Sequence, residues 1–223
     1  MAGTLYVTGV PIGNYGDISE RAVQTLRQAD IICAEDPRVT VKLLEHLGIE
    51  KRCVLYADFT ECVDGESPAR ILLRGGTCAL VSDAGMPVIS DPGYEFIAFC
   101  RKNGVRVLSV PGPCAAIAAL SVCGLNVSRF TFEGFLTVNK PNRAAHLAAI
   151  KNEKRAIVFY EAAKKLPATL TDLYKTLGDR PCALVKEITK PGEDCEVTTL
   201  RAAAKKYAEK RLKGEYVIVI EAL

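Results

Sequence analysis

One stretch of sequence decides the fold, Val81-Ser82-Asp83-Ala84-Gly85-Met86-Pro87-Val88-Ile89-Ser90-Asp91-Pro92-Gly93. It begins at the end of a short apolar run, residues 78–81, which predicts a buried strand, and it shows no helical periodicity before Tyr94. A strand therefore ends in a long loop. Asp, Pro and Gly often form only turns, but a loop of this length between a strand and a helix favours a binding role. In an open parallel sheet, ligands bind at this end of the strands.

The size and composition of the chain are those of an ordinary globular protein. It has 223 residues, of which 49% are hydrophobic and 25% charged, enough for one large or two small domains. No apolar run approaches the roughly 20 residues of a membrane span, and residues 1–5 lack the pattern of a signal peptide. We therefore expect a cytoplasmic protein with no membrane association.

The cysteines and histidines do not suggest a metal site. The nine cysteines are scattered without a Cys-x-x-Cys pair, so they are interpreted as reduced core residues. The two histidines, His46 and His146, lie far apart in helical stretches. We expect neither a bound metal nor a histidine-based catalytic triad.

Charge is distributed unevenly along the chain. Residues 1–112 hold 11 Lys/Arg against 14 Asp/Glu, a net charge of −3, whereas residues 113–223 hold 18 against 12, a net charge of +6. A basic second half permits binding to a polyanion such as RNA, although lysine-rich helices often present only solvated faces.

Strands and helices alternate through the first half. Strands are predicted at residues 5–8, 31–34, 53–56, 78–81 and 105–110, and helices at 17–29 with Asp17 as cap, 39–47, 67–75 and 94–103. Residues 58–66 are polar and predict a mobile loop. Five strands alternating with helices are typical of a parallel sheet covered on both faces.

The second half predicts another α/β domain. Its strands are expected at residues 130–135, 156–160, 182–187, 196–199 and 215–220, with helices after the basic loop 140–143 and at 166–177 and 200–212. The sequence thus predicts two α/β domains, residues 1–112 and 113–223. A cleft between two domains is a favoured place for a cofactor.

Seven ordered motifs carry a family resemblance. They are Pro11-Ile12-Gly13-Asn14, Ala34-Glu35-Asp36 with Arg38, the Ser82 to Gly93 loop, Val110-Pro111-Gly112-Pro113-Cys114-Ala115-Ala116, Phe132-Glu133-Gly134-Phe135, Phe159-Tyr160-Glu161 and Lys213-Gly214-Glu215. Together, over residues 5–221, they resemble the tetrapyrrole methylase family. Within it they are most similar to members that methylate the 2'-hydroxyl of a cytidine in small-subunit ribosomal RNA.

The resemblance implies a fold, a cofactor and partners. It implies two α/β domains, the first with a mostly parallel sheet and the second with a mixed sheet, S-adenosylmethionine in the cleft between them, and a homodimer that acts on ribosomal RNA or the small ribosomal subunit. By similarity, the cofactor contacts fall on Pro11, Ile12, Gly85, Val88, Pro113, Cys114, Tyr160, Glu187, Gly214 and Glu215.

A ribose hydroxyl is a poor nucleophile, so its methylation benefits from a proton acceptor. Carboxylates near the cleft or a lysine with a depressed pKa are candidates, namely Glu35, Asp36, Asp83, Asp91, Glu133 and Lys190. Glu35 and Asp36 are favoured as catalytic residues. The predicted substrate-binding residues are Asn14, Arg38, Asp83, Asp91, Lys140, Arg143, Lys164, Lys165 and Lys190, of which the cations other than Lys190 would contact phosphates.

Some positions depart from the family pattern, and two other functions remain open. The family commonly has threonine where Pro37 and Met86 stand, and Ser-Pro-His-Arg where residues 162–165 stand, on the substrate side of the expected site. One alternative is the same cofactor with another acceptor, such as a tetrapyrrole carbon. The other is a non-catalytic RNA-binding module. The basic second half favours RNA, and the cofactor loops favour an enzyme.

Overall fold

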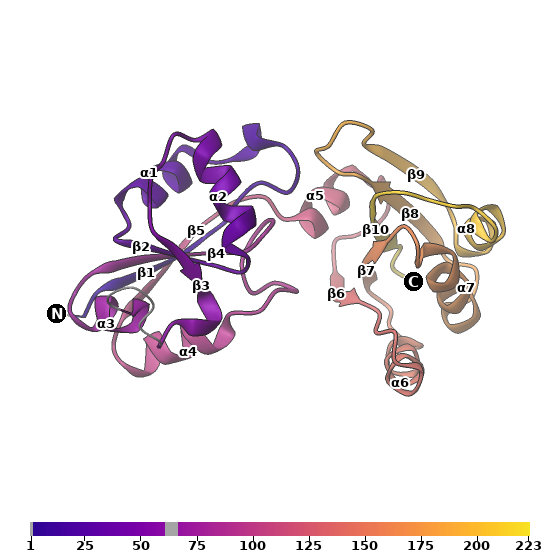
Figure 1. Ribbon diagram of the computed structural model, residues 1–223. Coiled ribbons are helices and arrows are strands. Elements are labelled where there is room, and N and C mark those ends of the chain that lie inside the picture. The colour runs from indigo at the N-terminus through magenta and orange to yellow at the C-terminus, as the bar shows by residue number, and fades with distance from the viewer. Residues whose placement is uncertain (1, 61–66) are drawn as a thin grey trace. The chain divides into compact units, whose positions relative to one another are not determined.

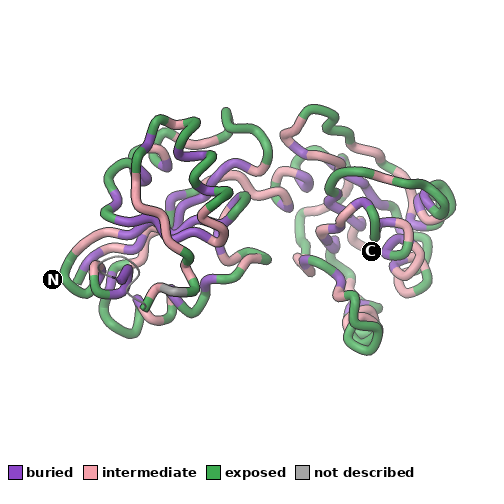
Figure 2. The backbone as a smooth tube through the Cα atoms, in the orientation of Figure 1, coloured by how far each residue is buried: buried purple, intermediate pink, exposed green. Residues whose placement is uncertain are grey.

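A computed structural model describes residues 2–60 and 67–223. Residues 61–66, most of the polar loop predicted at 58–66, lie outside the described part of the chain. The chain forms two compact units, Met1–Cys114 and Ala115–Leu223. Each has its own sheet and its own buried core, coloured purple in Figure 2.

Unit 1 contains the predicted parallel sheet. Its strands are β1 (Thr4–Thr8), β2 (Ile31–Ala34), β3 (Cys53–Leu55), β4 (Thr77–Val81) and β5 (Arg106–Val110), in the order β3-β2-β4-β1-β5. All of its pairings are parallel. Helices α1 (Glu20–Gln28) and α2 (Pro37–His46) cover one face, and α3 (Pro68–Leu73) and α4 (Tyr94–Lys102) cover the other (Figure 1). The carboxyl ends of all five strands therefore lie at one edge.

The predicted cap of the first helix is wrong. Ser19, not Asp17, is the N-cap of α1, because its hydroxyl accepts a hydrogen bond from the Ala22 amide at 3.1 Å. Asp17 ends a separate 3-10 turn, Tyr15–Asp17. Similarly, α2 begins at Pro37 rather than residue 39, since proline suits the first helical position and Asp36 caps it.

Unit 2 has a mixed sheet, as predicted. Its strands are β6 (Phe130–Phe135), β7 (Ala156–Ala162), β8 (Pro181–Lys186), β9 (Asp194–Thr199) and β10 (Glu215–Ile220), in the order β6-β7-β10-β8-β9. β6 and β7 are parallel, and the other neighbours are antiparallel. Helices α6 (Lys140–Ile150), α7 (Leu166–Leu177) and α8 (Leu200–Tyr207) enclose one core with the sheet. The last of them is shorter than the predicted 200–212.

Helix α5 (Ala115–Val122) covers the opposite face of this sheet (Figure 1). The sequence analysis did not predict it. Its sequence, Ala-Ala-Ile-Ala-Ala-Leu-Ser-Val, is apolar on nearly every side, so it lacks the amphipathic period by which a surface helix is recognised.

The cysteines lie mostly inside the two cores. Of the eight that the structure describes, all are free thiols and five are buried, namely Cys33, Cys78, Cys100, Cys123 and Cys182. Burial raises the pKa of the Cys182 thiol to about 12, as expected for an unreactive core residue. Within the described residues, no helix has the length and apolar character needed to cross a membrane.

Candidate active site

Three loops leave the carboxyl ends of β1, β4 and β5 and are joined through their backbones. Val10 and Gly85 exchange two hydrogen bonds, with the Val10 amide donating to the Gly85 carbonyl at 2.9 Å and the Gly85 amide donating back at 3.2 Å. The Gly9 amide donates to the Val110 carbonyl at 2.9 Å. The loop predicted from Ser82 to Gly93 is therefore held against the first-strand loop.

Two glycine contacts require the absence of a side chain. A Cβ on Gly9 would lie 2.6 Å from the Cα of Gly112, which is closer than real Cβ contacts. Gly85 has φ +82°, and a Cβ there would lie 3.2 Å from Ile12 Cγ2 and 3.3 Å from the Pro113 carbonyl oxygen. Three predicted cofactor residues, Ile12, Gly85 and Pro113, thus meet at one point.

The central loop also holds two non-glycine residues in the left-handed region. Val88 has φ +76° and Ser90 has φ +68°. A β-branched residue with positive φ is a genuine outlier, and strain of this kind persists where the surroundings enforce it, often at functional sites. Ser82 is 3% exposed, and its hydroxyl lies within hydrogen-bond distance of the carbonyls of Ala84 (3.3 Å) and Gly85 (3.4 Å). The loop thus has an unusual backbone conformation at the predicted contact Val88.

Carboxylates gather beside this loop, where the neighbouring strands β2 and β4 end. The Asp83 amide donates to Glu35 Oε2 at 3.2 Å, and the Asp36 amide donates to Asp83 Oδ1 at 3.0 Å. Burial, and then the carboxylates of Glu35 and Asp83, raise the pKa of Asp91 to about 6. The structure therefore brings together four of the predicted site carboxylates.

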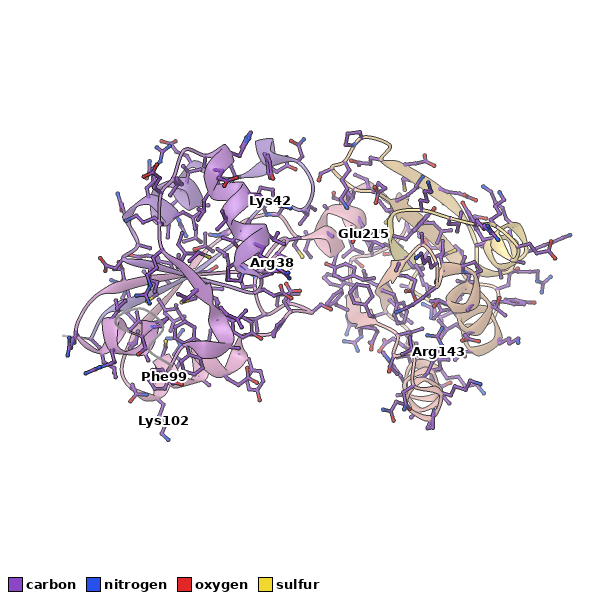
Figure 3. The ribbon with its side chains drawn as sticks, in the orientation of Figure 1. Arg38, Lys42, Phe99, Lys102, Arg143 and Glu215 are labelled. Carbon is purple, nitrogen blue, oxygen red and sulfur yellow. The ribbon has the colours of Figure 1, made fainter. Side chains whose placement is uncertain are left out.

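Asp36 is already engaged in holding the start of α2. Its carboxylate caps the helix and accepts hydrogen bonds from the Arg38 amide at 2.9 Å and the Arg38 guanidinium at 2.7 Å. These bonds lower the pKa of Asp36 to about 2. The Arg38 side chain is 90% exposed in the first turn of α2 (Figure 3). Asp36 is consequently a poor proton acceptor.

In unit 2, the predicted residues Glu187, Gly214 and Glu215 also lie together. The Glu215 amide donates to Glu187 Oε1 at 2.8 Å, and the Glu187 amide donates to the Glu215 carbonyl at 2.9 Å. Gly214 has φ +95°, and a Cβ there would lie 2.7 Å from the Glu187 carboxyl carbon. Glu187 itself has φ +49°. At Gly214, glycine takes without strain a φ angle that other residues rarely adopt.

Lys190 belongs to the same group, as an ion-pair partner rather than a base. Its ammonium lies 2.5 Å from Glu215 Oε2 and 3.7 Å from Glu187 Oε1. Burial opposes the charged form, but these carboxylates outweigh it and raise the pKa of Lys190. The depressed pKa that a lysine base requires is therefore not found here.

Tyr160 of β7 holds the first turn of α5. Its hydroxyl accepts a hydrogen bond from the Ala116 amide at 3.0 Å. That amide is one of the unpaired donors at a helix start, so the tyrosine fixes where α5 begins.

Arg143 lies differently from the prediction that it contacts phosphate. Its guanidinium donates to Asp172 Oδ2 at 2.8 Å and to the Thr169 hydroxyl at 2.9 Å, and its side chain is only 16% exposed. Thr169 in turn donates to the carboxylate of Glu161, which is 2% exposed. Arg143, labelled in Figure 3, therefore links α6 to α7.

The other predicted substrate residues are exposed: Asn14, Lys140, Lys164 and Lys165. Asn14 caps the 3-10 turn by accepting a hydrogen bond from the Gly16 amide at 2.9 Å. In the described parts of the chain, no three His, Cys, Asp or Glu side chains are grouped so that they could hold a metal ion.

Some features of the site were missed by the sequence reasoning. The hydrogen bond from Ala116 to Tyr160 depends on a helix that was not predicted. The contact between Gly9 and Gly112 had a signal in the sequence, since Gly9 directly follows one strand and Gly112 comes two residues after the end of another. The positive φ angles of Val88 and Ser90 had no signal in the sequence, because valine and serine normally adopt negative φ angles.

Known proteins are similar to this chain in sequence over nearly its whole length. The family model described as "Tetrapyrrole (Corrin/Porphyrin) Methylases" matches residues 4–204. The chain is 44% identical to "Ribosomal RNA small subunit methyltransferase I" of Escherichia coli O157:H7, covering 98% of this chain and 78% of that protein. It is 42% identical to the protein of the same name from Halalkalibacterium halodurans, covering 98% and 76%.

Solved structures share the fold. The methyltransferase CobJ aligns with a TM-score of 0.71 at 17% identity, covering 99% of this chain and 95% of that one. Uroporphyrin-III-C-methyltransferase from Thermus thermophilus aligns with a TM-score of 0.67 at 19% identity, covering 97% and 94%.

The two-unit α/β fold is thus that of a class of methyltransferases. The chain belongs to the tetrapyrrole methylase family, which confirms the resemblance found in the sequence motifs.

Proposed function

We propose that this protein transfers a methyl group from S-adenosylmethionine to the 2'-hydroxyl of a cytidine ribose in small-subunit ribosomal RNA. The observation that carries the proposal is the identity of 42–44% to curated small-subunit ribosomal RNA methyltransferases along almost the entire chain. A ribosomal substrate also implies a cytoplasmic protein. The homodimer that the family resemblance implies stays a prediction.

The loops of unit 1 fit a cofactor that is bound mainly by backbone groups. Gly85 leaves space between Ile12 and Pro113 that a side chain would fill, and the strained Val88 holds the adjoining backbone in one shape. Bound S-adenosylmethionine supplies an electrophilic methyl group on a sulfonium. We assign the unit 1 contacts to Pro11, Ile12, Gly85, Val88, Pro113 and Cys114.

In unit 2, we assign cofactor contacts to Tyr160, Glu187, Gly214 and Glu215. The support is local: the close approach of Gly214 to Glu187 and the hydrogen bond of Tyr160 to the start of α5. That one cofactor molecule contacts residues of both units stays a prediction.

The protein must also accept the proton of the ribose hydroxyl. A general base works best when its pKa lies near the working pH, and among the clustered carboxylates Asp91 has a pKa of about 6 whereas Asp36 has one of about 2. Asp91 is therefore the better proton acceptor of the two. Glu35 contributes by facing Asp83 and by raising the pKa of Asp91.

Positioning supplies much of the remaining acceleration, because holding two reactants in line replaces a bimolecular encounter. Exposed cations, namely Arg38, Lys140, Lys164 and Lys165, are available for phosphates. Phosphate contacts of this kind position a nucleic acid, and the 2'-hydroxyl distinguishes RNA from DNA.

The test is mass spectrometry of small-subunit ribosomal RNA, naked and assembled into subunits, after incubation with the protein and isotope-labelled S-adenosylmethionine. We expect one labelled cytidine ribose in at least one of the two substrates. The Gly85→Val variant serves as the inactive control. Absence of label from both RNA substrates would refute the proposal.

A further inference from the structure

Two phenylalanines of β6, Phe132 and Phe135, have no role in the function described so far. Phe132 and Phe135 of β6 both contact the ring of Tyr160 on β7, with centroids 4.9 Å and 5.6 Å apart and interplanar angles of 67° and 63°. In a regular strand, residues three apart point to opposite faces. Here the register shifts between Phe132 and Gly134, and Gly134 has φ +62°. The bulge brings both phenylalanines to the same ring.

This arrangement leaves Phe135 unusually open. It is 54% exposed, and Val138, in the segment that leads to α6, is 70% exposed. Because its contact with Tyr160 is edge-to-face rather than stacked, the exposed part of the Phe135 ring is available to a flat group. The ring is also too exposed to form the wall of an enclosed pocket for the cofactor's sulfonium.

Three lysines follow the ends of the two strands that carry these rings. β6 and β7 are parallel neighbours, so they end at the same edge of the sheet (Figure 1). β6 leads to Lys140 at the start of α6, and β7 leads to Lys164 and Lys165 before α7. The three lysines are exposed and have no ion-pair partner in the part of the chain that the structure describes.

The nearby carboxylates, in contrast, each lie against a side-chain partner of their own. Glu133 lies 2.9 Å from His146, and Asp172 lies 2.8 Å from Arg143. The arginine link also holds α6 against α7, and so keeps the two lysine-bearing helix starts next to each other. The named side chains therefore carry a net positive charge, since Lys140, Lys164, Lys165 and Arg143 stand against only Glu133 and Asp172.

An exposed aromatic ring flanked by lysines matches the chemistry of single-stranded nucleic acid. Bases stack on aromatic side chains while a positive groove follows the phosphates, and sequence-specific RNA recognition mostly uses unpaired nucleotides. A protein partner fits less well, because lysine is depleted at the cores of protein interfaces.

We propose that Phe135 stacks on an unpaired nucleobase of the RNA substrate, with Lys140, Lys164 and Lys165 on the flanking phosphates. The inference rests on the proposed function and adds to it the surface that recognises the substrate. Phe132 and Tyr160 support the ring from behind, and the bulge at Gly134 sets its direction.

The chain contains no tryptophan, so Phe135→Trp creates a single fluorescent probe at the proposed contact. The matched control is Phe130→Trp, at the opposite end of the same strand, where the native phenylalanine is 38% exposed. Both variants are titrated, without cofactor, with an unstructured oligocytidylate and with the same chain lacking its bases. We expect the intact oligonucleotide to quench the tryptophan fluorescence of Phe135→Trp, and the abasic chain to leave it unchanged. Neither oligonucleotide should quench the fluorescence of Phe130→Trp.

Affinity gives the second measurement. The Phe135→Ala variant should bind oligocytidylate with about tenfold lower affinity, because one stacked base is lost. The Phe130→Ala variant should keep the affinity of the native protein. Equal quenching by intact and abasic chains, no quenching at 135, or native affinity of Phe135→Ala would overturn the inference. If the native protein methylates ribosomal RNA despite such results, only the stacking surface is refuted. If it methylates no RNA, the proposed function itself fails.

Discussion

Substitution of Gly85 tests the proposed cofactor loops directly. With φ +82°, any side chain at this position carries a strain of about 1–2 kcal/mol. An added Cβ would also lie 3.2 Å from Ile12 Cγ2 and 3.3 Å from the Pro113 carbonyl, so both loops must move by a few tenths of an ångström. Since Ile12 and Pro113 are themselves proposed contacts, that movement reaches the cofactor.

The expected loss of affinity follows from these distances. If the movement of the two loops costs about 1.4 kcal/mol of binding free energy, Gly85→Ala binds S-adenosylmethionine about tenfold more weakly. Gly85→Val adds two methyl groups in the same space and should show no measurable binding. Isothermal titration calorimetry measures the affinity, and thermal unfolding shows whether each variant is folded.

Gly104→Ala is the matched control. Gly104 has φ +71°, and a Cβ there would meet no atom within 4 Å, so alanine brings the same backbone strain without a contact. Both alanine variants should lower the melting temperature, by about 2–4 °C per kcal/mol for a chain of this size. Only the change at Gly85 should affect affinity. A folded Gly85→Val protein with native affinity would show that the cofactor does not bind at these loops.

Three other substitutions test the charged side chains. Lys164→Ala combined with Lys165→Ala should weaken RNA binding and reduce the slope of log affinity against log salt by about 1.4, because two phosphate contacts are lost; fluorescence anisotropy over a salt series measures this. Arg143→Ala should lower the free energy of unfolding by about 1–3 kcal/mol, because Asp172 and Thr169 lose their donor, with little change in RNA affinity. Asp91→Asn should lower the rate of methyl transfer by about 10²-fold or more, measured in single-turnover assays. The same variant should be more stable than the native protein at pH 7, but not at pH 4, because asparagine lacks the charge that burial opposes.

The pH dependence follows from the direction of the Asp91 shift. Its pKa is raised from 3.8 to about 6 in the folded protein, so between these values the folded state holds a proton that the unfolded state releases. Stability therefore falls as pH rises through this window, and asparagine removes that fall. An equal gain in stability for Asp91→Asn at pH 4 and pH 7 would contradict the raised pKa.

For the lysine pair, the control is the exposed pair Arg101 and Lys102 on α4. An equal change in the salt dependence of RNA affinity for both pairs would exclude a specific site. An Arg143→Ala protein of native stability would refute its structural role.

The alternating pattern of unit 1 could be predicted from the sequence because it contains short apolar runs, several of which lead into segments with Gly or Pro. Residues 31–34, for example, are all buried, as a strand covered on both faces requires. The pattern failed at α5, where apolar residues on all sides leave no period to detect. It also misplaced the cap of α1, because Asp17 and Ser19 are both good capping residues and only the Ala22 hydrogen bond separates them.

In the candidate site, residues with a local backbone role could be predicted from the sequence, whereas residues whose role depends on distant partners could not. Gly85 could be singled out from the sequence because it lies in a long loop after a strand, where glycine serves a backbone conformation that other residues avoid. Gly214 could be named only through the family resemblance. A charged side chain gives no such signal, because its role depends on partners that the fold brings from elsewhere. Arg143 meets Asp172, 29 residues away, and this partner changes it from an expected phosphate contact into a link between helices.

The same reasoning explains why the proton acceptor could not be selected from the sequence. Asp36 and Asp91 are both carboxylates in Pro-containing loops, and both follow a strand at the same sheet edge. The fold gives Asp36 an arginine and a helix start, which favour its charged form, and gives Asp91 burial and two neighbouring carboxylates, which oppose it. Their pKa values are thereby separated from a common 3.8 to about 2 and about 6. Because such a separation divides structural from proton-accepting roles, Asp36→Asn should retain the cap, since asparagine also caps helices, and lose less activity than Asp91→Asn.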